Sequence, residues 1–387
     1  MMQGKGRSLS RLWAAGTVLL AGLAAAWAAE EKIDFQKARE LLQKQRQGQT
    51  LTDEERQYLQ RAMEARRKAA QRPDGPRPSG GKPSVGLVPL SDMGKDARYK
   101  GEDGGLYGGG MNEPPAEHAA AARRELAEVQ PLDAEGKGSP DGKVVLMSIG
   151  MSNTSQEFGA FLPLAQKDPD KAPHVVVVNS AFGGMDVTAW AESRRGSYGT
   201  TWEGAGRRLT AAGVTPRQVQ VVWLKQAKIN PAASGEFPAH ARKLADGIAK
   251  ILALAKEAYP NLRVAYLSGR IYAGYAGTPL NPEPYAYESA FSVRWLIQEQ
   301  IKGDAKLNYD PAKGPVRCPL LLWGPYLWAD GTTPRKTDGL SYTRDDLAGD
   351  GTHPSPSGQA KAAQLLLKFF QTDPLARTWY LPARPKP

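Results

Sequence analysis

The sequence predicts an α/β fold in which helices cover both sides of a parallel sheet. Five short and nearly continuous apolar runs follow one another after residue 143, and strands buried on both faces have this composition. Stretches with helical spacing separate these runs. Strands that alternate with helices in this way are typical of a parallel sheet with a helical layer on each side.

The five runs are expected to form the strands of one sheet. In chain order they read KVVLMSIG, HVVVVNSAFGG, VQVVWLK, LRVAYLSG and CPLLLWG. The clearest helix is expected from Ala239 to Tyr259, because Leu244, Ile248 and other apolar residues recur there at helical spacing. Further helices are expected from Glu288 to Ile301 and from Ser357 to Phe370. This domain is expected to span residues 143–374, followed by a tail at 375–387.

The first 29 residues are expected to be a signal peptide. Basic residues precede the apolar stretch LWAAGTVLLAGLAAAW and small residues follow it, which is the order found in secretory signals. An uncleaved membrane anchor is the alternative, since the stretch approaches the length of a membrane span. The Ala-Trp-Ala end favours cleavage. We therefore expect an exported protein, periplasmic or extracellular, with a membrane contact only if this segment is retained.

Two segments of different composition precede the predicted sheet. Residues 30–72 predict a helical hairpin, with Gly48 at its turn, and Thr52 and Glu55 have the spacing of a capping box. The hairpin could dock onto a partner or serve as a spacer with an apolar seam. Residues 73–142 are rich in Gly, Pro and charge, so a linker or an irregular wrap is expected, with a short helix near 116–129.

Composition excludes several classes of function. The chain has 387 residues, 41% of them hydrophobic, and a formal net charge of +11, but no dense basic stripe with interleaved aromatic residues, so no nucleic-acid partner is expected. Its one cysteine, Cys318, cannot form an internal disulfide and is expected in the core. The histidines outside the segment DGTHPSPSG have no partner at ligand spacing, so neither a metal site nor a cofactor is expected.

Residues suited to acyl transfer follow the ends of the predicted strands, where open parallel sheets place their reactive crevice. Ser152 follows the first strand, while Asp350 and His353 precede the last helix. A serine hydroxyl needs an imidazole to accept its proton, and the imidazole needs a carboxylate to fix its tautomer. The three-residue spacing of Asp350 and His353 allows both side chains to lie on one side of a turn. Ser152, Asp350 and His353 are therefore the expected catalytic residues.

An oxyanion hole needs hydrogen-bond donors that are already oriented. The amides of Ser152 and Gly184 can supply two donors, and the side chain of Gln226 a third. Each residue also has an ordinary structural explanation. Ser152 could cap a helix, Gly184 could serve a tight turn, and Asp350 could be a plain turn residue. The joint order of the segments along the chain favours the catalytic interpretation.

Four segments together resemble a known enzyme family. IGMSN, NSAFGGMDVTAW, VVWLKQ and DGTHPSPSG are similar, in this order, to the four sequence blocks of the SGNH (GDSL-like) hydrolases, and the first two are most similar to the sialate O-acetylesterase-like carbohydrate esterases. The resemblance covers residues 143–372. It implies a flavodoxin-like three-layer α/β/α sandwich with Ser152 as nucleophile, Asp350 and His353 completing the triad, and Gly184 with a third-block side chain in the oxyanion hole.

The third block departs from the family pattern. It usually carries Gly-x-Asn-Asp, or Gln-Gly-Glu in the acetylesterase branch, whereas this chain reads LKQAK. Either Gln226 or Lys225 could replace the missing donor. If neither side chain faced the serine, turnover would be weak or absent.

Four residues near the predicted site are expected to contact substrate: Asn153, Trp190, Arg194 and Lys225. The indole of Trp190 could stack on a sugar ring or pack in the core. Arg194 lies in the loop after the second block and could hold a substrate carboxylate or remain solvated.

The expected function is that of an exported serine esterase that removes acetyl or similar acyl groups from carbohydrate through an acyl-enzyme on Ser152. Its partner would be an acylated carbohydrate or polysaccharide. The alternative, prompted by LKQAK, is an SGNH-like protein with little or no activity that binds a glycan or an envelope partner. A lipid esterase would need a broad apolar groove for the acyl chain.

Overall fold

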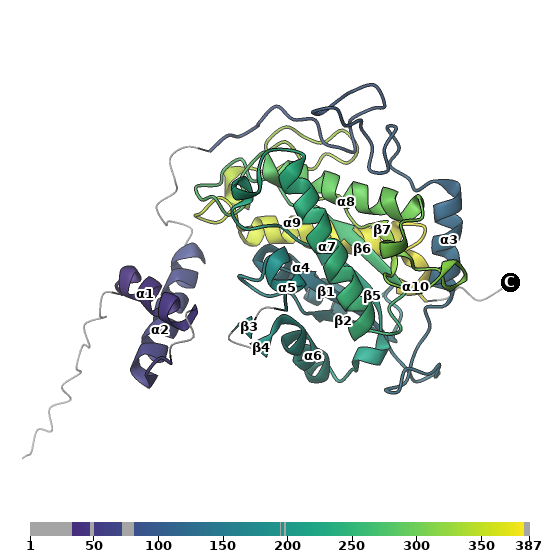
Figure 1. The fold of residues 1–387 in the computed structure, drawn as a ribbon, viewed down its shortest axis with the longest axis horizontal. Coiled ribbons are helices and arrows are strands. Elements are labelled where there is room, and N and C mark those ends of the chain that lie inside the picture. Colours follow the sequence, from purple (N-terminus) through teal and green to yellow (C-terminus); the bar gives the residue numbers. More distant parts are fainter. Residues whose placement is uncertain (1–32, 47–49, 72–80, 194, 197–198, 383–387) are drawn as a thin grey trace, which may run out of the picture. The chain divides into compact units, whose positions relative to one another are not determined.

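The computed structural model describes residues 33–46, 50–71, 81–193, 195–196 and 199–382 (Figure 1). The chain divides into two compact units, Met1–Lys68 and Ala69–Pro387. The predicted signal peptide lies outside the described residues. Within the described ranges, no helix has both the length and the apolar character needed to cross a membrane.

The described part of the first unit contains α1 (Phe35–Arg46) and most of α2 (Asp53–Gln71). The Glu55 N–H donates to Thr52 Oγ1 at 3.2 Å, and the Thr52 N–H donates to Glu55 Oε2 at 3.0 Å. This reciprocal pair is the capping box expected from the sequence, and it satisfies two amides at the start of α2. A small apolar core joins the two helices and consists of Ala38, Leu41, Leu51, Leu59 and Ala62.

The second unit is built around one five-stranded parallel sheet, and each of the five apolar runs contributes one strand. The strands are β1 (Val144–Gly150), β2 (Val175–Asn179), β5 (Val219–Lys225), β6 (Val264–Ser268) and β7 (Leu320–Trp323). They lie in the order β2-β1-β5-β6-β7, with all neighbours parallel. Numbered along the chain within this sheet, the order is 2-1-3-4-5, which is that of flavodoxin-like folds. The predicted fold class is confirmed.

Helices cover the sheet in two groups (Figure 1). In one group α4 (Ser152–Lys167) packs on α9 (Pro356–Thr372). In the same group α10 (Arg377–Tyr380) contacts both α9 and α3 (Ala116–Ala127). In the other group α7 (Ala239–Ala258) contacts α5 (Val187–Ala191) and α8 (Tyr285–Ile301), and α5 contacts α6 (Thr201–Ala211). A small antiparallel pair, β3 (Arg195–Gly196) and β4 (Gly199–Thr200), lies outside the main sheet.

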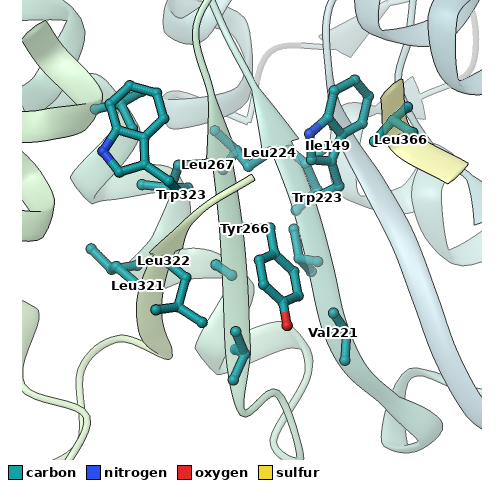
Figure 2. Close-up of a cluster of buried hydrophobic side chains, with 14 of the residues drawn as sticks. Ile149, Val221, Trp223, Leu224, Tyr266, Leu267, Leu321, Leu322, Trp323 and Leu366 are labelled. Carbon is teal, nitrogen blue, oxygen red and sulfur yellow. The ribbon is translucent and has the colours of Figure 1, made fainter. Parts of the chain in front are cut away.

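Four of the five strands, β1, β5, β6 and β7, are buried on both faces, and the edge strand β2 is partly exposed. All seven residues of β1 and all seven of β5 are buried, which explains why their sequences do not alternate between apolar and polar. Figure 2 shows Trp223, Tyr266 and Trp323 among the aliphatic side chains of neighbouring strands. The Trp223 ring stacks on Phe158 of α4 at a centroid distance of 5.5 Å, and its indole N–H donates to Ser268 Oγ at 3.0 Å.

The described part of the Gly- and Pro-rich segment is irregular up to residue 115, and α3 follows it. Polar contacts attach it to the sheet unit. The N–H groups of Val85 and Gly86 donate to the Asp330 carboxylate at 2.8 and 3.0 Å, and buried Arg294 of α8 pairs with Glu102. Because these groups are held by specific partners, the segment belongs to the same compact unit as the sheet despite its composition.

Candidate active site

The site begins where β1 ends and α4 starts. Gly150 is the last residue of β1, and a Cβ atom there would lie 2.4 Å from both the Lys225 carbonyl oxygen and Thr154 Oγ1. Only glycine fits this approach, so the chain turns directly from the strand into the helix. Ser152 is the first residue of α4 and therefore stands at the carboxyl end of the sheet, the edge at which open α/β sheets bind ligands.

The structure brings Ser152, His353 and Asp350 together in one hydrogen-bonded chain. Ser152 Oγ lies 2.8 Å from His353 Nε2, and His353 Nδ1 lies 2.5 Å from Asp350 Oδ2. An ionised carboxylate only accepts hydrogen bonds, so Nδ1 carries the ring proton and Nε2 is left to accept the proton of the serine hydroxyl. This is the arrangement that a serine nucleophile requires. We call these three residues the triad.

The Asp350 carboxylate is held in its ionised form. Burial by itself raises the pKa of Asp350, but the hydrogen bond and charge of His353, with the N–H groups of Thr352 and His353, outweigh burial and bring the pKa down to about 2. Both N–H groups donate to Oδ1 at 3.0 Å, which leaves Oδ2 for the imidazole. The carboxylate therefore stays negative over the whole range in which enzymes usually work.

We expect Asp350 to make folding stability depend on pH in acid. Its folded pKa of about 2 lies below its unfolded value of about 3.9, so its contribution to the free energy of unfolding is present above pH ~4 and is lost as the pH falls toward 2. Asp350→Asn should therefore lower the free energy of unfolding by about 2 kcal/mol at pH 5 and by almost nothing at pH 2. Urea denaturation from pH 5 to pH 2 measures this difference. Asp141→Asn, at an exposed aspartate, is the control, and a loss for Asp350→Asn that is independent of pH would contradict the prediction.

A tight turn ahead of α9 holds the triad imidazole. The Ala348 N–H donates to the His353 carbonyl oxygen at 2.7 Å, and the Gly351 N–H donates to the Ala348 carbonyl oxygen at 2.8 Å. Gly351 has φ +65°, and a Cβ atom there would lie 1.8 Å from the Tyr275 carbonyl oxygen, so the turn requires glycine. Asp350 is thus both a turn residue and a member of the triad.

Asn153 joins the start of α4 to this turn. Its Nδ2 donates to the Thr352 carbonyl oxygen at 3.0 Å, and its side chain is buried. Asn153 also lines the cavity beside Ser152, where a substrate contact was expected. The hydrogen bond gives it a second role, because it fixes the position of the residue that precedes the triad imidazole.

Two of the three expected oxyanion donors lie at the cavity. Ser152 begins a 16-residue helix whose N-cap residue, Met151, provides no side-chain hydrogen bond, so no N-cap side chain occupies the amides of the first turn, and the positive end of the helix dipole lies at Ser152. Gly184 lines the same cavity and has φ +76°. Gln226 is buried, does not line the cavity, and its amide group has no hydrogen-bond partner among the described residues. Its role as a donor stays a prediction.

The cavity at the triad is small, with a volume of about 170 Å³. Ser152 and His353 lie on its wall, together with Asp186, Arg270 and Asn281. Two larger cavities, of about 590 and 640 Å³, lie near Trp323 and near Glu283, and no triad residue lines either of them. The size of a cavity therefore does not locate the chemistry in this protein.

The expected substrate contact of Lys225 is wrong. Lys225 is the last residue of β5, but its side chain is fully buried and its Nζ lies 2.5 Å from Glu157 of α4, whose side chain is fully buried too. Burial lowers the pKa of Lys225 to about 8. Because the pair lies between the sheet and α4 and does not line the cavity, Lys225 neither contacts substrate nor donates to an oxyanion.

Trp190 also has a structural role in place of the expected substrate contact. It is fully buried, its indole N–H donates to the Gly150 carbonyl oxygen at 3.0 Å, and its ring packs edge-on against Trp202 at 5.0 Å. Because Trp190 lies near a strand end, its indole was expected to stack on a sugar ring. In the structure the ring faces the core and supports the end of β1. Arg194 lies outside the described residues.

Asp186, Arg270 and Asn281 are among the residues on the cavity wall that the sequence did not identify as site residues. Asp186 accepts the N–H groups of Ala189 and Ile229, each at 3.1 Å, and so fixes the loop beside Gly184. Asn281 and Arg270 present buried polar groups to the cavity. The sequence does contain a signal for Arg270, because this residue directly follows the predicted strand LRVAYLSG. No group of three metal-ligating side chains occurs among the residues that the structure describes.

Comparisons with known proteins add little to this geometry. No protein-family model matches the chain, and no curated protein matches it. A solved structure of a proposed acylhydrolase from Bacteroides fragilis is similar over 69% of this chain and 100% of its own, with 13% sequence identity and a TM-score of 0.36.

Proposed function

We propose that the protein is a serine-dependent carboxylic ester hydrolase that removes acetyl or similarly small acyl groups from carbohydrate. The observation that carries the proposal is the chain of hydrogen bonds from Ser152 Oγ through the His353 ring to Asp350, at 2.8 and 2.5 Å. It stands at the start of a helix and at the carboxyl edge of the sheet, where a developing oxyanion meets oriented N–H groups. The resemblance of four segments to the SGNH hydrolases supports the same chemistry.

The geometry supports a reaction in two halves. As Ser152 Oγ bonds to the ester carbonyl carbon, His353 Nε2 accepts the hydroxyl proton and the carbonyl electron pair moves onto oxygen. The bond to the sugar oxygen then breaks, and the imidazolium returns the proton to the departing alkoxide. Water repeats the attack through the same imidazole, which releases the carboxylic acid and regenerates Ser152.

The size of the cavity supports a small acyl group. A volume of about 170 Å³ lies below the range of about 300–1,000 Å³ that is usual for sites of drug-sized ligands, and it suits an acetyl group. The carbohydrate part of the proposal rests on the sequence resemblance. Export rests on the first 29 residues of the sequence.

A fluorophosphonate probe tests the nucleophile directly. We expect the folded protein to acquire one adduct, located on Ser152 by mass spectrometry of its peptides, because among the described residues only this hydroxyl is hydrogen-bonded to the triad imidazole. His353→Gln should suppress the adduct, since the variant removes the proton acceptor. Labelling of other serines, or equal labelling of unfolded protein, would count against the proposal.

A second candidate function is glycan or envelope binding without turnover. The observation that favours it is the third block, because Lys225 is committed to Glu157 and Gln226 does not line the cavity. Absence of any adduct on Ser152, together with glycan retention that Ser152→Ala leaves unchanged, would favour this candidate over the esterase.

A further inference from the structure

Arg270 is a buried cation on the wall of the cavity that holds Ser152. It lies two residues beyond β6, its exposed fraction is 2%, and it lines the cavity together with the triad serine and imidazole. Arginine is almost never fully buried unless it is paired with a carboxylate, because removing an ion from water is costly. A buried guanidinium at this place therefore needs a partner.

Arg270 has no such partner within the described part of the chain. It forms no ion pair there, its Nε has no hydrogen-bond partner, and its Nη2 reaches only the Thr352 carbonyl oxygen at 3.4 Å. A neutral acceptor at that distance makes a weak hydrogen bond. Most of the donor capacity of the guanidinium is thus unused.

The carboxylates that act on Arg270 at longer range are engaged elsewhere. Glu157 lies 2.5 Å from Lys225, and the triad carboxylate lies 2.5 Å from the triad imidazole. Glu283 accepts three hydrogen bonds, from the indole of Trp328 and from two backbone N–H groups. Burial is the strongest influence on Arg270 and lowers its pKa despite these three acids. Its positive charge is therefore not matched by a carboxylate in contact.

The rest of the cavity wall is also short of negative charge. Lys228 lines it as a second cation, and its Nζ lies 3.1 Å from the hydroxyl oxygen of Thr188. Asp186 is the acid on the wall, but both of its oxygens accept backbone N–H groups. Asn281, 4% exposed, adds an amide whose Nδ2 donates to the Lys228 carbonyl oxygen at 3.3 Å. Among the described residues on the wall, two cations, Arg270 and Lys228, therefore stand against one carboxylate, Asp186, and this excess of positive charge favours an anionic ligand.

We propose that Arg270 binds a carboxylate of the substrate, so that the enzyme prefers esters that carry a carboxylate a few bonds from the carbonyl that Ser152 attacks. This inference rests on the proposed esterase function and narrows its substrate class. Guanidinium groups bind carboxylates through two parallel hydrogen bonds, which also orients the ester. Because the cavity is only about 170 Å³, the carboxylate and the ester carbonyl belong to one small group.

The carboxylate could sit on either side of the ester bond. In a half-ester of succinate it belongs to the acyl group, and in the acetate ester of a 2-hydroxy acid it belongs to the alcohol. The chemistry that Arg270 recognises is the same in both cases, and two pairs of substrates separate them. 4-Nitrophenyl hemisuccinate is compared with 4-nitrophenyl butyrate, and O-acetyl-lactate is compared with O-acetyl-lactamide.

Kinetics of Arg270→Gln test the proposal. We expect the wild type to favour the charged member of one pair by about 10- to 100-fold in kcat/KM, because this is the usual effect of hydrogen bonds between charged groups. Arg270→Gln should abolish that preference, so that kcat/KM falls about 10- to 100-fold more on the charged member than on the neutral member. Arg270→Lys should retain part of it, because it keeps the charge and loses the paired geometry. Arg317→Gln, at an exposed arginine, controls for net charge.

Two results would overturn the proposal. An equal loss on the charged and neutral esters in Arg270→Gln would mean that Arg270 acts only through Thr352 on the turn that holds His353. A wild type without preference in either pair would mean that no carboxylate is recognised. Circular dichroism of both Arg270 variants shows that the comparison is made on folded protein.

Binding to Ser152→Ala separates this inference from the esterase proposal. We expect succinate, and not succinamide, to raise the Tm of Ser152→Ala, and the added Arg270→Gln substitution to remove the shift. If no ester is hydrolysed but this shift occurs, the anion site stands and the esterase proposal falls. If esters are hydrolysed without charge preference and succinate has no effect, the esterase stands and the anion site falls.

Discussion

Replacing Ser152 with alanine is expected to lower kcat for an acetyl ester by about four to six orders of magnitude, to the background rate. The Ser152 hydroxyl oxygen lies 2.8 Å from His353 Nε2, and without this hydroxyl no acyl-enzyme forms. KM should change little, since the oxyanion donors and the cavity wall remain in place. Initial rates on 4-nitrophenyl acetate and on a panel of acetylated sugars measure the effect.

Ser155→Ala is the matched control for this experiment. Ser155 lies one turn further along α4, outside the triad and the cavity wall, so its loss should leave kcat within about threefold. Residual activity of Ser152→Ala above one percent of wild type would mean that another group attacks the ester. Equal losses in both variants would instead indicate damage to α4.

Removing one member of the buried pair formed by Lys225 and Glu157 is expected to lower the free energy of unfolding by about 3–5 kcal/mol. Both side chains are fully buried and lie 2.5 Å apart, so Glu157→Leu leaves an ammonium ion without a counter-charge between β5 and α4. The double variant Glu157→Leu/Lys225→Met should recover most of the loss, because it removes both charges and keeps the volume. Urea denaturation of Glu157→Leu, Lys225→Met and the double variant measures these differences.

An exposed pair provides the control for the buried one. Arg242 and Glu299 lie 2.9 Å apart with side chains 48% and 39% exposed, so Glu299→Leu should cost less than about 1 kcal/mol. A single Glu157→Leu variant as stable as wild type, or a double variant less stable than either single one, would contradict the expected coupling.

The strands and the triad were open to prediction because each leaves a strong local signal. Strands buried on both faces must be apolar throughout, so the five runs identify the sheet directly. The turn that carries Asp350 and His353 needs glycine and precedes a recognisable helix, which makes its sequence distinctive. Once the sheet is parallel, the ends of its strands meet at one edge, and Ser152 and His353 are brought to the same place.

The direction of a side chain at a strand end was not open to prediction. Lys225 ends β5, as expected, but whether it faces the crevice or the helical layer depends on the strand's rotation and on which helix covers it. Glu157 lies 68 positions away in the sequence and nothing local connects the two. The substrate contact predicted for Trp190 was missed for a related reason. The sequence near a strand end does not show whether an indole faces solvent or supports the strand.

The irregular segment shows another limit of composition. Its Gly and Pro content predicts few helices and strands, because such a segment buries little apolar area for its length, and residues 81–115 are irregular. The contacts that hold it are polar and distant in sequence, such as the Asp330 carboxylate that binds the N–H groups of Val85 and Gly86. Composition indicates how much apolar area a segment can bury. It does not indicate a hydrogen-bond acceptor that lies more than 240 residues away in the sequence.

The turn ahead of α9 carries two members of the triad within four residues, and this reduces the assembly of the site to a single long-range fit. The acid and the base arrive together on one short piece of chain, already aligned by local hydrogen bonds. Only the meeting of that piece with the start of α4 has to be achieved by the tertiary fold, and α4 and α9 pack directly on each other. Loops elsewhere can therefore lengthen or shorten during evolution without disturbing the reacting atoms, whereas a slip of one helix along the other would separate them.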